Sequence, residues 1–291
     1  MTTLAELIDH FLADLHRRLR PNTLRAYRAD LVIAAAHFRQ PLDQISPKQI
    51  ETFLGDPAVA KSTARRRAAS LSRFFQWAVR EGHVEQNPLD LVEPLELDRR
   101  LPRPVPAGDP RKDVAKAIAA APQPYRMIFT LLRETGMRVG EVLGLNLGDV
   151  TLEPGREGLR IREAKNKSER VATLGPNSTP KSLRGLRAYL RDLGAGLPST
   201  TPLFCSNRGT QVSYAAAQYQ WARLCSKAGL VEADDALRYT LHQLRHTRGT
   251  ELIEEGKPLE IVQRVLGHRD IRSTQGYADL SEAQVRAVLE G

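Results

Sequence analysis

The sequence predicts a mainly α-helical protein with a small antiparallel β-sheet, divided into two domains. Three observations predict this fold class. Most of the chain repeats apolar residues at the spacing of three to four that marks one face of a helix. Residues 150–174 show short apolar runs separated by polar turns, which is typical of hairpins. A proline-rich segment at 98–108 divides a 291-residue chain, whose 41% hydrophobic residues are enough for two cores.

Residues 1–97 are expected to form a bundle of four helices. The first helix has a capping signal, because Thr3 is followed three residues later by Glu6. The last helix ends before Gly82, a residue type that favours helix termini. The four helices are expected at about 2–18, from Pro21 to about Phe38, from Ser46-Pro47 to about Leu54, and from Lys61 to about Arg80.

Residues 109–291 are expected to form a second domain in which helices surround a small sheet. The turn of its second hairpin carries Lys165 and Lys167. Strands are expected at 150–152, 159–162 and 170–174, with Leu203-Phe204-Cys205 as an edge strand. Helices are expected at about 110–120, 124–135, 138–144, 179–193, 213–228, 241–255, 258–266, 271–278 and, at the C-terminus, 281–290.

The composition favours a nucleic-acid partner. The formal charge is +9 and the pI about 9.8, and Lys and Arg gain affinity by releasing counterions from a phosphate backbone. Cys205 and Cys225 give neither a disulfide framework nor a metal-binding spacing. No apolar run approaches the ~20 residues that cross a bilayer, and the N-terminus lacks a signal-peptide pattern, so we expect a cytoplasmic protein.

The fourth helix begins with a basic cluster, Lys61 followed by Arg65, Arg66 and Arg67. A solvated helix face is one interpretation of this cluster. The other is a helix whose N-terminus lies against DNA phosphates, because the helix dipole adds to the charge there. The cluster alone leaves both open.

Residues 98–108 form the expected linker, because alternating prolines disfavour helix and sheet and favour an extended polyproline II segment. At ~3.1 Å per residue the segment reaches roughly 30 Å, more than the ~12 Å width of a DNA major groove. Arg99, Arg100 and Arg103 on this strap are predicted to meet phosphates, so that two domains could close around a duplex.

Two clusters in the second domain carry candidate chemistry. Arg138 and Glu141 are three residues apart in an apolar helix, where a buried arginine needs an acidic partner. His242 and Arg245 share the same spacing, so both can reach one phosphate, and His246 is expected to point elsewhere and to pack. A zinc-protease interpretation of the two histidines is disfavoured, because Gln243 stands where that motif needs glutamate.

The order Arg, Lys, His-x-x-Arg, His, Tyr, with His268 nine residues before Tyr277, resembles the tyrosine recombinases of the phage integrase family, in an Xer-type layout. The resemblance implies an N-terminal four-helix core-binding (SAM-like) domain and an α+β catalytic domain. Carried over position by position, it implies that the catalytic residues are Arg138, Lys165, His242, Arg245, His268 and the nucleophile Tyr277, with Glu141 supporting Arg138.

Two positions depart from the family pattern. Gly276 stands directly before the tyrosine, where a larger residue is usual, and is expected to loosen that segment. Glu251 occupies a place that a histidine often takes. Lys167 lies in the same turn as Lys165, so the choice of lysine also stays open.

The chemistry implied is a phosphoryl transfer in which the phenol of Tyr277 attacks a DNA phosphodiester. Arg138 and Arg245, with a donor from His242 or His268, would stabilise the charge that builds up on the non-bridging oxygens. A tyrosine needs a proton acceptor as it attacks, and a neutral His242 is the first choice. Protonation of the leaving 5′-oxygen by the lysine would complete a 3′-phosphotyrosyl bond, with no metal, ATP or other cofactor expected.

The expected partners are double-stranded DNA and further copies of the chain. The resemblance implies a tetramer on two duplexes, with the helix at 281–290 exchanged between neighbours, and leaves open a second recombinase or an accessory protein. A type IB-like topoisomerase and a non-catalytic DNA-binding protein remain the alternatives. The DNA site, and the choice between dimer resolution, element integration and transposition, lie beyond these residues.

Overall fold

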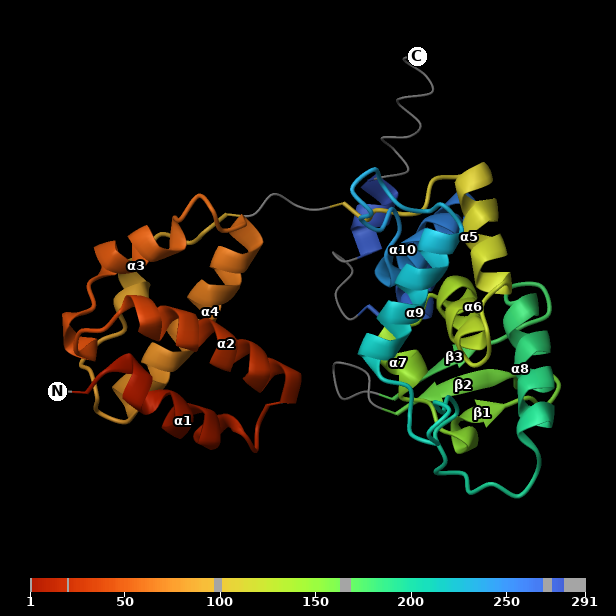
Figure 1. Cartoon of the computed structure of the whole chain (residues 1–291), viewed down its shortest axis with the longest axis horizontal. Coiled ribbons are helices and arrows are strands. Elements are labelled where there is room, and N and C mark those ends of the chain that lie inside the picture. Colours follow the sequence, from red (N-terminus) through yellow and green to blue (C-terminus); the bar gives the residue numbers. More distant parts are fainter. Residues whose placement is uncertain (1, 20, 97–100, 163–168, 269–273, 280–291) are drawn as a thin grey trace, which may run out of the picture. The chain divides into compact units, whose positions relative to one another are not determined.

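The computed structural model describes residues 2–19, 21–96, 101–162, 169–268 and 274–279. The chain separates into two compact units, Met1–Arg99 and Arg100–Gly291 (Figure 1). The predicted linker at 98–108 contains the boundary between them. In the described part of the chain, no helix is long and apolar enough to cross a membrane.

The first unit contains four α-helices in its described residues, as predicted. They are α1 (Leu4–Leu15), α2 (Pro21–His37), α3 (Pro47–Leu54) and α4 (Lys61–Arg80), with single 3-10 turns at Leu42–Gln44 and Pro88–Leu91. The capping box predicted at Thr3 is present, with the Thr3 N–H donating to Glu6 at 2.8 Å. The core is aromatic at its centre, where the ring of Phe11 lies 5.4 Å from Phe74 and 5.6 Å from Trp77.

The second unit is helical around one small sheet. Its helices are α5 (Asp109–Ala119), α6 (Tyr125–Thr135), α7 (Val139–Leu143), α8 (Pro180–Leu193), α9 (Tyr214–Lys227), α10 (Leu241–Glu254) and α11 (Leu259–Leu266), with a 3-10 turn at Leu147–Asp149. Residues 274–279 are also helical. The central helix is α6, which packs against α5, α7, α8 and α10 (Figure 1). The helix predicted at 281–290 lies outside the described residues.

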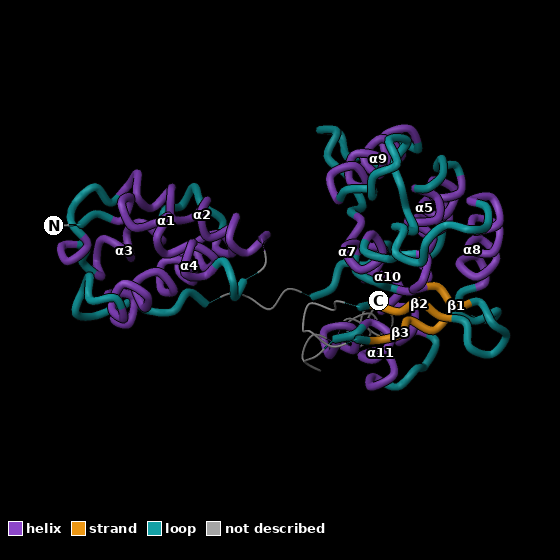
Figure 2. Tube along the Cα trace, turned by 90° about the horizontal axis from the view of Figure 1, so that it is seen from below, coloured by secondary structure: helices purple, strands orange, loops and turns teal. Residues whose placement is uncertain are grey.

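The sheet has the order β1-β2-β3 and is antiparallel throughout, with β1 at Val150–Thr151, β2 at Gly158–Ile161 and β3 at Arg170–Thr173. In β2 and β3 the side chains of Leu159, Ile161 and Ala172 are buried in the core. Figure 2 shows β3 running beside α11, which brings the sheet close to the C-terminal helices.

The edge strand predicted at 203–205 is wrong. Leu203 instead donates its N–H to Leu145 at 2.8 Å, and Phe204 accepts from Val212 at 2.9 Å. Only an isolated bridge joins Cys205 to Gln211. The apolar run is therefore a buried loop segment, whose backbone is satisfied by local partners rather than by the sheet.

The second half of the predicted linker packs against the helices of the second unit. Residues 101–108 have no helix or strand. Val105 is fully buried, and its N–H donates to Oγ1 of Thr247 on α10 at 2.9 Å. Arg111 of α5 donates through Nε to the Val105 carbonyl at 3.2 Å. Both backbone polar groups of Val105 are thus bonded to the second unit.

Candidate active site

The turn between α6 and α7 places Arg138. Gly136 ends α6 with φ +66°, a left-handed conformation that favours glycine, and a Cβ there would also lie 2.6 Å from the Leu266 side chain. Arg138 caps α7 and bonds Glu141 twice, through its backbone N–H at 2.9 Å and its guanidinium at 2.8 Å. The Arg138–Glu141 pair that the spacing predicted is confirmed.

Glu141 is ionised in this setting. Its side chain is only 4% exposed, and burial alone would raise the pKa of its carboxyl group. The charge of the nearby Arg170 and the hydrogen bonds from Arg138 outweigh that burial and lower the pKa of Glu141 overall. A charged carboxylate therefore fixes the orientation of Arg138.

Arg245 of α10 is buried and reaches two backbone carbonyls, one through each terminal nitrogen. It donates to Gly136 at 2.6 Å and to Leu266 at 2.8 Å. Burial, with Arg138 close by, lowers the pKa of Arg245 to about 10, so the side chain keeps its charge at neutral pH. The arginine thereby ties the end of α6 to the end of α11, with a positive charge between them.

Tyr277 lies in the helical turn 274–279 with its ring against α10. The side chain is 1% exposed. Its phenol oxygen lies 2.9 Å from Nδ1 of His246. The ring sits over Gly249, where a Cβ would lie 2.6 Å from Cε1 of the tyrosine. The candidate nucleophile is therefore buried against α10, between His246 and Gly249.

Burial keeps the groups around the phenol in their neutral forms. It raises the pKa of Tyr277 to about 12, although Arg245 and Arg138 act in the opposite direction. It also lowers the pKa of His246 to about 4 and that of His268 to about 3. At neutral pH both histidines are uncharged and hold a lone pair that can accept a proton.

The other two histidines, His268 and His242, lie close to Tyr277 and His246 respectively. Nδ1 of His268 lies 2.9 Å from the Thr274 hydroxyl, and its ring stacks on Tyr277 at a centroid distance of 6.2 Å. His242 makes an edge contact with His246, with ring centroids 4.5 Å apart. Its side chain is exposed, yet partial desolvation, together with Arg245 and Arg138, lowers its pKa.

The prediction that His246 points elsewhere is wrong. His242, His246 and Gly249 are spaced i, i+4 and i+7, so they form one stripe of α10, and this stripe faces Tyr277. Arg245 faces the neighbouring direction, toward the ends of α6 and α11. The stripe was visible in the sequence, but its partner was not.

Two known family profiles match this chain. The profile described as "Phage integrase family" matches residues 111–284, and that described as "Phage integrase, N-terminal SAM-like domain" matches residues 8–82. The first covers more than half of the chain.

The chain belongs to the phage integrase family.

Individual relatives agree with this assignment. Tyrosine recombinase XerD of Yersinia pestis is 31% identical over 290 residues, which cover 96% of this chain and 94% of the relative. Tyrosine recombinase XerC of Thermodesulfovibrio yellowstonii is 29% identical over 286 residues, covering 95% and 92%. A lambda integrase fragment in a dimer bound to a COC′ core site shares the fold, with a TM-score of 0.75 at 22% identity and 95% of each chain covered.

The family assignment agrees with the predicted fold class and identifies this chain as a tyrosine recombinase of Xer type. Of the predicted site residues, the structure brings together Arg138, Glu141, His242, Arg245, His268 and Tyr277. Lys165, Lys167, Arg99 and Arg100 lie outside the described residues.

Two of the basic residues predicted to bind DNA already have protein partners in this recombinase. Arg66 forms a 2.8 Å ion pair with Asp30, a buried carboxylate that also accepts from Ser70 at 2.8 Å. The guanidinium of Arg67 lies over the ring of Phe53, 5.6 Å from its centroid. Both arginines therefore stabilise the first unit, whatever else they bind.

The other described members of that set, Lys61, Arg65 and Arg103, are exposed. Lys61 and Arg65 are one helical turn apart and so lie on one face of α4.

Gly276 does not leave a gap before Tyr277. The residue is buried, and a Cβ there would lie 3.1 Å from Cδ of Pro102 in the linker segment. The glycine thus permits close packing between the linker and the residue that precedes Tyr277.

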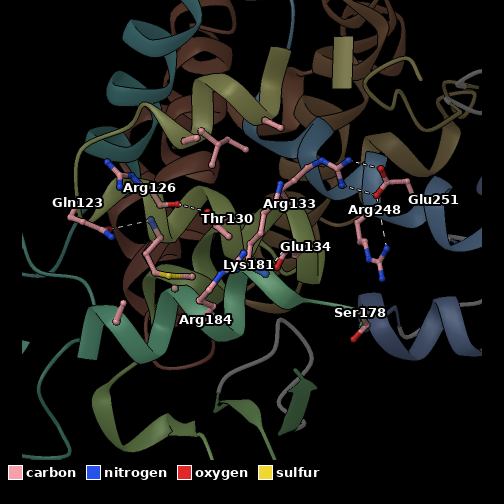
Figure 3. Close-up of a pocket in the computed structure, with 16 residues that line it drawn as sticks. Gln123, Arg126, Thr130, Arg133, Glu134, Ser178, Lys181, Arg184, Arg248 and Glu251 are labelled. Atoms are coloured by element: carbon pink, nitrogen blue, oxygen red, sulfur yellow. Dashed lines mark hydrogen bonds and ion pairs between the residues drawn. The ribbon is translucent and has the colours of Figure 1, made fainter. Parts of the chain in front are cut away.

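Glu251, the second departure from the family pattern, joins three helices. It accepts a bidentate pair from Arg133 of α6, one bond being 2.6 Å long, and lies 3.6 Å from the guanidinium of Arg111 on α5. Figure 3 shows Arg133 reaching from α6 toward Glu251 and Arg248 on α10. The pair borders a cavity of about 490 Å³ between α5, α6, α8 and α10. None of the candidate catalytic residues that the structure describes lines this cavity, so it is separate from the candidate active site.

Proposed function

We propose that this tyrosine recombinase is a site-specific DNA recombinase that cleaves and rejoins strands through a 3′-phosphotyrosyl intermediate. One observation carries the proposal: two guanidinium groups and three histidines lie around one buried tyrosine, Tyr277. The pKa of each of these histidines is lowered. Charged donors and a tyrosine suit phosphodiester exchange, in which negative charge builds up on the non-bridging oxygens.

In this mechanism Arg138 and Arg245 bind the scissile phosphate and stabilise its transition state. Tyr277 attacks phosphorus and releases a DNA 5′-oxygen, which takes a proton from Lys165. His268 supplies a further donor to the phosphate. Because the phosphotyrosyl bond keeps the energy of the phosphodiester, a 5′-hydroxyl from a second strand can reverse the step.

We retain His242 as the proton acceptor during cleavage. Among the three histidines it is the exposed one, and it lies one helical turn before Arg245, at spacing i, i+3. His246 is proposed to hold the phenol before DNA binds, because its Nδ1 lies within hydrogen-bond distance of the phenol oxygen in the DNA-free chain.

The partners follow from the same proposal. The lambda integrase structures are a dimer on a core site and a tetramer bound to a Holliday junction. We propose that this recombinase also acts as a tetramer on duplex DNA, with residues 281–290 docking on a neighbour, and that it works in the cytoplasm. Lys61, Arg65 and Arg103 are proposed DNA contacts.

The direct test is a suicide substrate, a duplex nicked near the cleavage position so that the covalent complex accumulates. The wild-type chain should form an adduct that resists denaturant, and Tyr277→Phe should form none while still binding the DNA. An adduct with Tyr277→Phe would show that another residue is the nucleophile.

The same assay separates the alternatives. Relaxation of a supercoiled plasmid that lacks any particular site would support a topoisomerase. Specific DNA binding with no adduct on nicked substrates of the bound sequence would support a non-catalytic DNA-binding protein.

A further inference from the structure

Arg170, the first residue of β3, is a buried arginine to which the proposed mechanism gives no role. Its side chain is 15% exposed. One terminal nitrogen donates to Oε2 of Glu141 at 2.8 Å, and the other donates to the carbonyl of Val265 at 3.0 Å. Its Nε is buried, with no hydrogen-bond partner among the described residues. The side chain therefore lies between the sheet, α7 and the end of α11.

Three arginines from three different places meet at the C-terminus of α11. The carbonyl of Val265 accepts from Arg170, that of Leu266 accepts from Arg245, and that of Gly267 accepts from Arg138 at 3.3 Å. The last carbonyls of a helix lack intrahelical partners and carry the negative end of its dipole. This end of α11 is thus a common anchor for Arg170 and for both arginines of the proposed phosphate site.

Gly267 allows Arg170 to approach this closely. Gly267 has φ +66°, and a Cβ on it would lie 2.4 Å from Nε of Arg170. His268 is the next residue in the chain, and its N–H closes the helix end on the Gln263 carbonyl at 3.0 Å. A change at Arg170 is therefore transmitted to the backbone that carries His268.

Glu141 gives Arg170 a second route to the same site. Oε1 of this carboxylate receives the guanidinium of Arg138, while Oε2 receives the Arg138 backbone N–H and Arg170. Loss of Arg170 would leave a nearly buried carboxylate with one cation instead of two. Glu141 would then hold Arg138 less rigidly.

We propose that Arg170 is a positioning residue for strand cleavage, which fixes Arg138 through Glu141 and fixes Arg245 and His268 through the end of α11. The inference rests on the proposed function, since it assigns a role in that reaction. Arg170 itself touches no reacting atom. Its loss should therefore slow the chemical step and leave DNA affinity nearly unchanged.

The experiment measures single-turnover cleavage of the nicked substrate at saturating protein, with DNA affinity and the thermal midpoint measured in parallel. Arg170→Gln should lower the cleavage rate by about 10- to 100-fold, the size expected when catalytic groups move by roughly 1 Å. DNA affinity should change by less than about threefold. Arg170→Lys keeps the charge but lacks the planar fork that bonds Glu141 and the Val265 carbonyl together. Its cleavage rate should therefore lie between those of the wild type and Arg170→Gln.

Arg133→Gln is the matched control. Arg133 is similarly buried, with 18% exposure, and it too pairs with a carboxylate, which it bonds through both terminal nitrogens, but it lies beside the cavity rather than at α11. It should lose stability comparably and keep the wild-type cleavage rate once bound. If Arg170→Gln misfolds, Arg170→Lys carries the test, because it conserves charge and volume.

Two outcomes would overturn the inference while the proposed function stands: wild-type cleavage rates in both Arg170 variants, or an equal loss of rate in Arg133→Gln. Failure of the wild-type chain to form any Tyr277 adduct would instead overturn the proposed function. A double-mutant cycle with Arg170→Gln and Glu141→Gln gives an independent test. If Arg170 acts through Glu141, the effects of the two substitutions on the cleavage rate should be strongly non-additive.

Discussion

The phenol oxygen of Tyr277 and Nδ1 of His246 lie 2.9 Å apart, and this contact keeps the candidate nucleophile folded against α10. The ring is fully buried and stands beside Gly249. To attack a phosphate in DNA, the tyrosine must exchange this partner for the scissile phosphorus. Binding of the DNA therefore has to compensate for a lost hydrogen bond and for newly exposed aromatic surface.

The two α10 histidines should have separable roles. His242→Gln removes the proposed proton acceptor and should lower single-turnover cleavage by about 100-fold or more. His246→Gln removes only the DNA-free partner of the phenol and should change the rate by less than about tenfold. The measurement is adduct formation on the nicked substrate. If the order of the two effects is reversed, His246 is the acceptor.

The close packing of Tyr277 against α10 depends on Gly249. Gly249→Ala places a methyl group 2.6 Å from Cε1 of Tyr277 and 3.0 Å from the Leu266 side chain, so this part of the core becomes overpacked. The free energy of unfolding should fall by about 1–3 kcal/mol in urea denaturation. Gly140→Ala in α7 is the control, because a Cβ there meets nothing within 4 Å. Equal stabilities of the two variants would contradict this close packing.

Two half-buried histidines, His246 and His268, should make the protein less stable in mild acid. The pKa of His246 is lowered to about 4 and that of His268 to about 3, below the ordinary value of 6.5. The unfolded chain therefore binds protons near pH 6.5, while the folded chain does not until about pH 4 or 3. The stabilising contribution is complete above about pH 6.5 and is lost as the pH falls toward about 4 for His246 and about 3 for His268.

The check is the urea midpoint measured between pH 7 and pH 4.5. Its decline should be shallower in His246→Gln and in His268→Gln than in the wild-type chain. Identical slopes in the wild-type chain and in both variants would show that neither half-buried histidine contributes.

The attachment of the linker to α10 should be measurable at one hydroxyl. Thr247 is fully buried, and its Oγ1 accepts the N–H of the equally buried Val105. Thr247→Val conserves shape but leaves that N–H without its acceptor, which should cost about 1–3 kcal/mol of unfolding free energy. Thr247→Ser keeps the hydroxyl and should lose less. Amide exchange at Val105 should quicken only in the valine variant.

The sequence by itself determined the fold class, the helices and the list of chemical groups. Helical spacing marked the apolar faces, and the capping box at Thr3 and the Arg138–Glu141 pair were predictable because both partners lie within one helical turn. The order of residue types around Tyr277 was specific enough to indicate the family.

Tertiary structure alone decided which groups face each other. Spacing places His246 on a stripe of α10, but only the return of residues 274–279 over that stripe brings it to Tyr277, 31 residues later. Likewise, Arg66 pairs with Asp30 across 36 residues, and Arg170 reaches Val265 across 95. Local periodicity fixes the direction of a side chain relative to its own helix, whereas its partner depends on how the helices pack.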